Sequence, residues 1–120
     1  MLRQIQAVAA LDSVAVAELP LRPLLAFCES AHSMISVDTG PAHAAAALGL
    51  PLVVMYGAES PQNWLPRSPC GTPVLGVGGP PARTRVDQIS VDAVFESWET
   101  LLQRSPIDRS ATPATACSLA

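Results

Sequence analysis

Two short apolar runs flank an alanine-rich segment near the middle of the chain. Residues 33–37 and 52–56 are of strand length and mostly apolar, which favours two short strands. The segment between them, residues 41–48, begins with a proline and is followed by Gly49 and Pro51, the common stop signals of a helix. Strand, helix and strand in this order are typical of a βαβ unit. The pattern therefore predicts two adjacent parallel strands with a helix on one face of the sheet.

Further elements are predicted on either side of this unit. Residues 21–30 have apolar side chains at helical spacing, and residues 73–77 have the composition of a last strand. Ser90 is a suitable N-cap for a helix that runs to about Gln103. The apolar side chains of this last helix are predicted to form a core face: Val91, Val94, Phe95, Trp98, Leu101 and Leu102.

The remaining segments give weaker patterns. Residues 57–71 are rich in proline and are predicted to form a long loop, with Trp64 anchoring it to the core or, alternatively, stacking on an adenine ring. Residues 6–19 are apolar enough for one or two short strands. Proline, serine, alanine and threonine predominate in residues 105–120, which predicts a disordered tail. We therefore expect one α/β domain over residues 1–104, followed by this tail.

The turn after the first predicted strand has the features of an anion site. Asp38, Thr39 and Gly40 precede a helix whose first backbone N–H groups have no partner within the helix. A phosphate placed against Thr39, Gly40 and Ala42 is expected to bind these N–H groups at the positive end of the helix dipole. His43, one turn into the helix, can donate a ring N–H to the same anion. Asp38 can accept a hydrogen bond from a sugar hydroxyl.

Asp38 and His43 also have simpler interpretations. Asp38 is a suitable N-cap for the following helix, and this role is compatible with ligand binding. His43 can be a helix histidine whose ring is satisfied by a neighbouring side chain. The two residues can also be drawn as a metal pair, but a metal site in a protein usually has at least a third ligand, so we expect no metal ion.

The same residues resemble the signature of an enzyme family. The motif Asp-Thr-Gly-Pro-x-His-x-Ala-x-Ala-Leu-Gly-x-Pro covers residues 38–51, and it is followed by an apolar strand and by Gly57, Pro61, Trp64 and Pro66. This order resembles the lipopolysaccharide heptosyltransferases, glycosyltransferase family 9, over about residues 19–66, and residues 86–102 are similar to the family's closing helix. These enzymes have two facing Rossmann-like domains, the GT-B fold. The resemblance implies an α/β fold, a Rossmann-like parallel sheet with flanking helices, that is part of the C-terminal, donor-binding domain.

The resemblance implies a role in binding a nucleotide-sugar for lipopolysaccharide core synthesis. Asp38, Thr39, Gly40 and His43 would contact the diphosphate or the sugar of a donor of the ADP-heptose type, without a cofactor. In the family, the N-terminal domain supplies the catalytic base and binds the lipopolysaccharide core acceptor. The chain resembles the back part of the other domain, so no residue is expected to be catalytic and the isolated chain is expected to be inactive.

Two departures from the family pattern favour an alternative. Glu59 occupies a position where the family usually has threonine or serine near the donor phosphates. The family's diphosphate-contacting lysine lies in the earlier part of its C-terminal domain, and this sequence contains no lysine. The alternative interpretation is a non-catalytic binding or interaction module from a truncated or degenerate gene.

Composition and net charge further limit the classes of partner and the location that we expect. The formal net charge is −3 and the basic residues do not cluster, so nucleic acid is not an expected partner. No apolar run reaches the ~20 residues of a transmembrane helix, and the expected location is cytoplasmic, with a peripheral position at the inner membrane as the alternative. Three widely spaced cysteines predict neither a disulfide framework nor a metal pair. A sheet edge left open near residues 6–19 predicts self-association.

Overall fold

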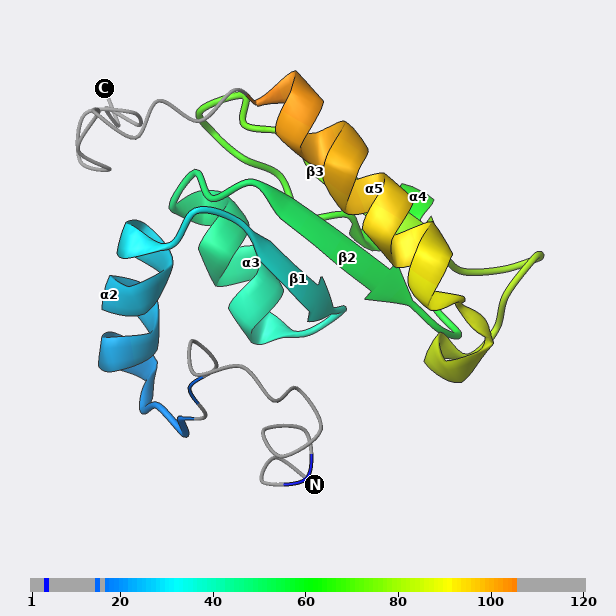
Figure 1. The fold of residues 1–120 in the computed structure, drawn as a ribbon, viewed down its shortest axis with the longest axis horizontal. Coiled ribbons are helices and arrows are strands. Elements are labelled where there is room, and N and C mark those ends of the chain that lie inside the picture. The colour runs from blue at the N-terminus through cyan, green and yellow to red at the C-terminus, as the bar shows by residue number, and fades with distance from the viewer. Residues whose placement is uncertain (1–3, 5–14, 16, 106–120) are drawn as a thin grey trace.

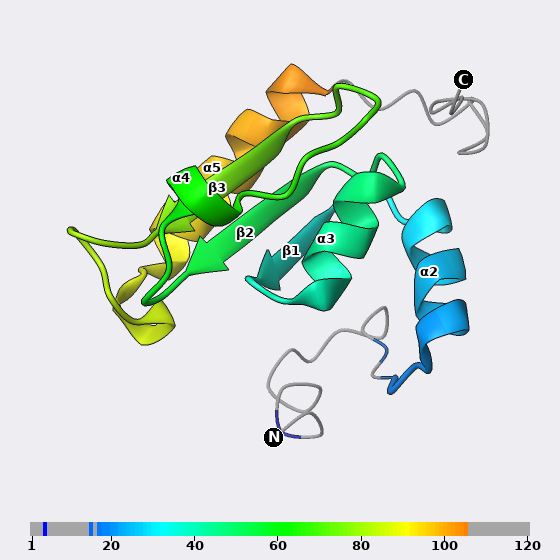
Figure 2. The same ribbon diagram turned by 180° about the vertical axis from the view of Figure 1, so that it is seen from behind.

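The fold is a parallel β-sheet with helices on both faces (Figures 1 and 2). The computed structural model describes Gln4, Ala15 and residues 17–105. Within this part, the helices are α2 (Leu21–Ser30), α3 (Gly40–Ala47), α4 (Pro61–Trp64) and α5 (Val91–Arg104), and the strands are β1 (Met34–Val37), β2 (Leu52–Tyr56) and β3 (Val74–Gly78). A short 3₁₀ turn, η1 (Val86–Gln88), precedes α5. The predicted α/β class is confirmed.

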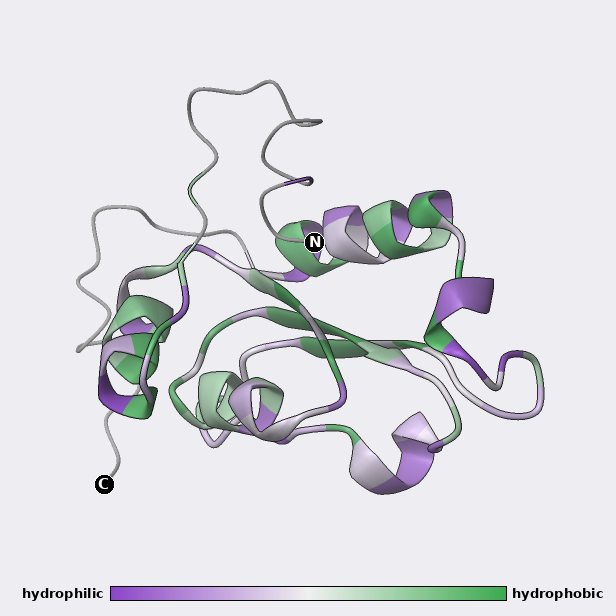
Figure 3. Ribbon diagram, turned by 90° about the horizontal axis from the view of Figure 1, so that it is seen from below, coloured by the Kyte–Doolittle hydropathy of each residue, from purple (hydrophilic) through white to green (hydrophobic). Residues whose placement is uncertain are grey.

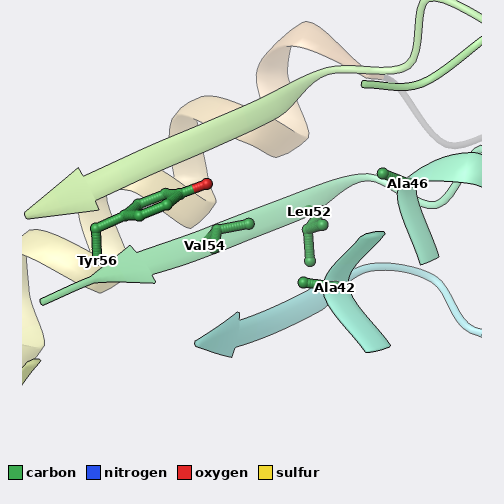
Figure 4. Close-up of a cluster of buried hydrophobic side chains, with 5 residues drawn as sticks. All are labelled: Ala42, Ala46, Leu52, Val54 and Tyr56. Atoms are coloured by element: carbon green, nitrogen blue, oxygen red, sulfur yellow. The ribbon is translucent and has the colours of Figure 1, made fainter. Parts of the chain in front are cut away.

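Strand β2 lies between β1 and β3, and both of its neighbours are parallel to it. Side chains alternate along a strand, so Leu52, Val54 and Tyr56 share one face of β2. With Ala42 and Ala46 of α3 they form one hydrophobic cluster, and all five are fully buried (Figure 4). Hydrophobic residues gather along the strands, between the helical layers (Figure 3). The small alanine side chains let α3 lie close against β2.

The predicted βαβ unit is confirmed. The runs 33–37 and 52–56 contain the adjacent parallel strands β1 and β2, and the helix between them begins and ends one residue earlier than expected. Helix α2 has its predicted bounds and packs beside α3, with Cys28 in one buried cluster with Ala45. Ser90 is the N-cap of α5, because its Oγ accepts a hydrogen bond from the Ala93 N–H at 3.1 Å.

The predicted loop over residues 57–71 contains a short helix that the sequence did not reveal. Helix α4 begins at Pro61, and the Ser60 hydroxyl oxygen caps it by accepting from the Gln62 N–H at 3.3 Å. The prediction that Trp64 anchors this segment is wrong, because 53% of its surface is exposed. Leu65, the next residue, packs against the core cluster instead. Four helical residues are too few to show which side faces inward.

The predicted core face of α5 is also partly wrong. Leu101 is buried, but Val91 is 83% exposed and Phe95 is 52% exposed. The reason is the position of α5, which packs mainly on β2 and β3. The same face of the sheet is therefore left open at β1, where Ile35 is 46% exposed and Val37 is 39% exposed.

Several predictions concern segments at the two ends of the chain. The strands expected within residues 6–19 and the tail expected over residues 105–120 lie almost entirely outside the described residues, and residues 17–19 are not in a strand. Cys70 is disulfide-bonded, so the expectation of no bridge is wrong for this residue, whereas Cys28 is a buried free thiol. No helix of the described part has the length and apolar character required to cross a membrane.

The hydroxyl of Tyr56 leads to the first prediction. It is buried and has no hydrogen-bond partner among the described residues. An unpaired buried hydroxyl is unfavourable by about 1–3 kcal/mol. We therefore expect Tyr56→Phe to leave the free energy of unfolding unchanged or to raise it, as measured by urea denaturation at neutral pH. A large loss of stability would show that the hydroxyl has a partner.

The same side chain gives a pH dependence. Burial, together with the negative charge of Asp38, raises the pKa of Tyr56 from 10.0 to about 12. Between these values the unfolded chain loses the phenol proton while the folded chain keeps it, so stability should fall as the pH rises from about 10 to about 12. The chain has one tyrosine, so tyrosinate absorbance reports its pKa directly. Tyr56→Phe removes this part of the decline, and an ordinary tyrosine titration would contradict the expected burial.

The outer edge of β1 leads to the next prediction. In the described part β1 is an edge strand, and its residues include no charge and no proline, the usual protection of such an edge. We expect concentration-dependent self-association in light scattering. Ile35→Lys should weaken it, whereas Leu21→Lys, at a 66% exposed position on α2, should not. A strictly monomeric wild type at high concentration would contradict this expectation.

Candidate functional site

The candidate site lies where the strands end, at the carboxyl edge of the sheet (Figure 1). The Asp38 N–H donates to the Met55 carbonyl oxygen at 3.2 Å, which extends the β1–β2 pairing to the last residue before the turn. Thr39 follows, and α3 begins at Gly40. Open α/β sheets bind their ligands outside this edge. The turn from β1 to α3 is therefore in a suitable position for a ligand.

Thr39, rather than Asp38, is the N-cap of α3. Its backbone is extended, with φ −150° and ψ 168°, and its hydroxyl donates to the Val37 carbonyl oxygen at 3.3 Å instead of capping the helix. The hypothesis that Asp38 caps the helix is thus not supported. Because no side chain caps α3, its first N–H groups remain available to another acceptor.

Two of these N–H groups are free. The Ala42 N–H, which the sequence suggested as a third phosphate contact, already donates to the Thr39 carbonyl oxygen at 3.0 Å. The N–H groups of Thr39 and Gly40 have no acceptor among the described residues. Nothing lies within 4 Å of the position that a Cβ on Gly40 would occupy, and both residues are exposed.

The side chains of Asp38 and His43 meet beside this helix end. Asp38 Oδ1 lies 3.5 Å from His43 Nε2, and the side chains are 21% and 48% exposed, respectively. The pair thus partly supports the simpler interpretation of His43, with Asp38 as its neighbour. No group of three or more candidate metal ligands occurs among the described residues.

The other two strand ends bring further residues to the same edge. The Glu59 carbonyl oxygen lies 3.1 Å from the position of a Cβ on Gly79, which follows β3. Glu59 is therefore beside the end of β3, on the far side of β2 from the Asp38 turn. Its side chain is exposed.

The sequence interpretation missed the loop after β3. Residues 83–88 carry two arginines, Arg83 and Arg85, and pack against Gly57 at the end of β2. The sequence contains only an indirect signal for this loop. Because it has no lysine, an arginine is the residue that could supply a permanent positive charge.

The comparison with protein families agrees with this geometry. Residues 2–91 match the model of glycosyltransferase family 9 (heptosyltransferase). No curated protein and no solved structure matches the chain. The match covers the described sheet, the turn from β1 to α3 and the loops at the carboxyl edge. The chain belongs to glycosyltransferase family 9.

Proposed function

We propose that this chain binds the diphosphate of a nucleotide-activated sugar at the N-terminus of α3. One observation carries the proposal: the N–H groups of Thr39 and Gly40 have no acceptor among the described residues, both residues are exposed, and they lie beside the Asp38–His43 pair. Main-chain donors at a helix N-terminus are suited to phosphate oxygens. Membership of family 9 supports a sugar donor as the ligand, and we propose a donor of the ADP-heptose type.

The proposed site acts by electrostatic stabilisation of the leaving group. In glycosyl transfer, an acceptor hydroxyl forms a bond to the anomeric carbon while the bond from that carbon to the diphosphate oxygen breaks. The electron pair of the broken bond stays on the nucleotide diphosphate, so negative charge develops there. The two N–H groups, the α3 dipole and the His43 ring all favour that charge. The proton of the acceptor hydroxyl goes to a base that we do not assign to this chain.

Asp38 has two compatible roles in this proposal. Its Oδ1 lies near the His43 ring and orients it. The other carboxylate oxygen can accept a hydrogen bond from a sugar hydroxyl. We propose the lipopolysaccharide core as the acceptor, bound by an acceptor-binding half, and the cytoplasmic side of the inner membrane as the place of reaction.

A non-catalytic binding module is the second candidate. The exposed Glu59 carboxylate at the carboxyl edge and the absence of lysine favour it. A transfer assay with ADP-heptose and a lipid A–Kdo acceptor distinguishes the two functions. Turnover above the uncatalysed rate supports the enzyme, whereas diphosphate binding without turnover supports the module.

The prediction for His43 tests the anion site. A charge-assisted hydrogen bond contributes roughly 1.5–3 kcal/mol, so His43→Ala should weaken ADP binding about tenfold or more in calorimetry. His32→Ala is the matched control, because His32 is exposed and precedes β1 at the opposite edge of the sheet. Equal ADP affinity for wild type and His43→Ala would contradict the anion site.

Glu59 gives a prediction of opposite sign. Glu59→Thr removes a negative charge at the carboxyl edge and should strengthen ADP binding, by less than about tenfold because exposed charges are screened. Glu99→Thr, on an exposed position of α5, makes the same change in net charge elsewhere. If calorimetry gives the same change for both variants, Glu59 has no local effect on the site.

A further inference from the structure

The loop over residues 83–88 lies at the same edge of the sheet as the proposed diphosphate site. A Cβ on Gly57 would be 3.6 Å from the Arg85 Cα and 3.5 Å from the Val86 nitrogen. Gly57 directly follows β2, which pairs with β1 up to Asp38. Neighbouring strands are ~4.8 Å apart. The backbone of Arg85 is therefore at the carboxyl edge beside the end of β2, one strand away from the Asp38 turn.

The backbone of this loop is held by its own hydrogen bonds. Gln88 Oε1 accepts from the Thr84 N–H at 3.0 Å and from the Arg85 N–H at 3.2 Å. The Gln88 carbonyl oxygen accepts from Arg83 Nε at 3.1 Å. Because these bonds fix the main chain, the Arg85 side chain projects from a defined position, which lowers the entropic cost of binding a ligand.

The Arg85 guanidinium is already arranged for an anion with two oxygens. Its Nε donates to Asp87 Oδ1 at 2.9 Å and its Nη2 donates to Asp87 Oδ2 at 2.6 Å. The side chains are 71% and 63% exposed, respectively. An exposed ion pair of this kind contributes little to stability. A phosphate group can therefore replace the carboxylate, since both anions fit the same fork of N–H donors.

Other arginines are less suited to this role. Arg83 donates from Nε and Nη1 to the carbonyl oxygens of Gln88 and Ala82, so its guanidinium is part of the loop. Arg104 is the last residue of α5, which begins at the carboxyl edge and runs to the opposite edge (Figure 1). Within this loop, Arg85 is the arginine that pairs with an exposed side chain, Asp87, which a ligand can displace.

We propose that Arg85 is a second cationic contact for the diphosphate and that Asp87 holds it in place until the ligand displaces the carboxylate. This inference rests on the proposed function, because it assumes that the diphosphate lies at the α3 N-terminus. Asp87 then acts as a competitor of the ligand.

Calorimetry with ADP and with adenosine tests this role. Arg85→Gln should weaken ADP binding about tenfold and leave adenosine binding unchanged, because adenosine carries no phosphate. Arg85→Lys should lie between Arg85→Gln and the wild type, because the charge remains and the fork is lost. Asp87→Asn should strengthen ADP binding severalfold, and Arg104→Gln is the control for net charge.

The outcomes separate this inference from the proposed function. If the wild type does not bind ADP, both are wrong. If His43→Ala weakens ADP binding and Arg85→Gln does not, the anion site stands and the role of Arg85 is wrong. If Arg85→Gln and Arg104→Gln weaken ADP binding equally, the role of Arg85 is also wrong, because the loss then reflects the change in net charge alone. Circular dichroism of each variant checks that its fold is kept.

Discussion

The packing of α3 on β2 is the contact on which the rest of the structure depends. Ala42 and Ala46 lie against Leu52 and Val54 with no exposed surface. Larger side chains at the two alanine positions would push the helix away from the sheet. Because the helix is fixed in this way, its N-terminus stays at the carboxyl edge, directly after β1. The binding proposal follows from this position, since the free N–H groups belong to the first residues of the helix.

The chemistry of the proposed site is divided between main chain and side chain. Main-chain donors at Thr39 and Gly40 are lost only on substitution by proline, and their direction is set by the backbone at the start of the helix. The ionisable groups, Asp38, His43 and Arg85, are side chains that are at least partly exposed. The main chain thus supplies the geometry of the anion site, and the side chains adjust its charge.

The sequence predicted the local features of this fold and not those that depend on tertiary packing. Strand β2 and helix α3 could be predicted because apolar runs and the signals at Gly49 and Pro51 are local. The exposure of Phe95 could not, since it depends on where α5 crosses the sheet. Similarly, the choice between Trp64 and Leu65 as the inward residue depends on how a four-residue helix is rotated.

The same distinction applies to the site. The motif located Asp38, Thr39, Gly40 and His43 at the end of β1, because strand, turn and helix follow one another directly. Whether the Ala42 N–H is free or already hydrogen-bonded depends on the exact geometry of the turn, which the motif does not specify. The approach of Arg85 to Gly57 joins segments far apart in the sequence, which no local pattern reveals.

The most direct test of the anion site is a titration of the ¹⁵N-labelled chain with ADP, followed by the backbone amide resonances. If the diphosphate binds at the α3 N-terminus, the Thr39 and Gly40 amides should show the largest chemical-shift changes, while the amide of Ala47 at the other end of α3 changes little. Saturable changes that spare Thr39 and Gly40, or no change at any amide, would contradict the proposed site.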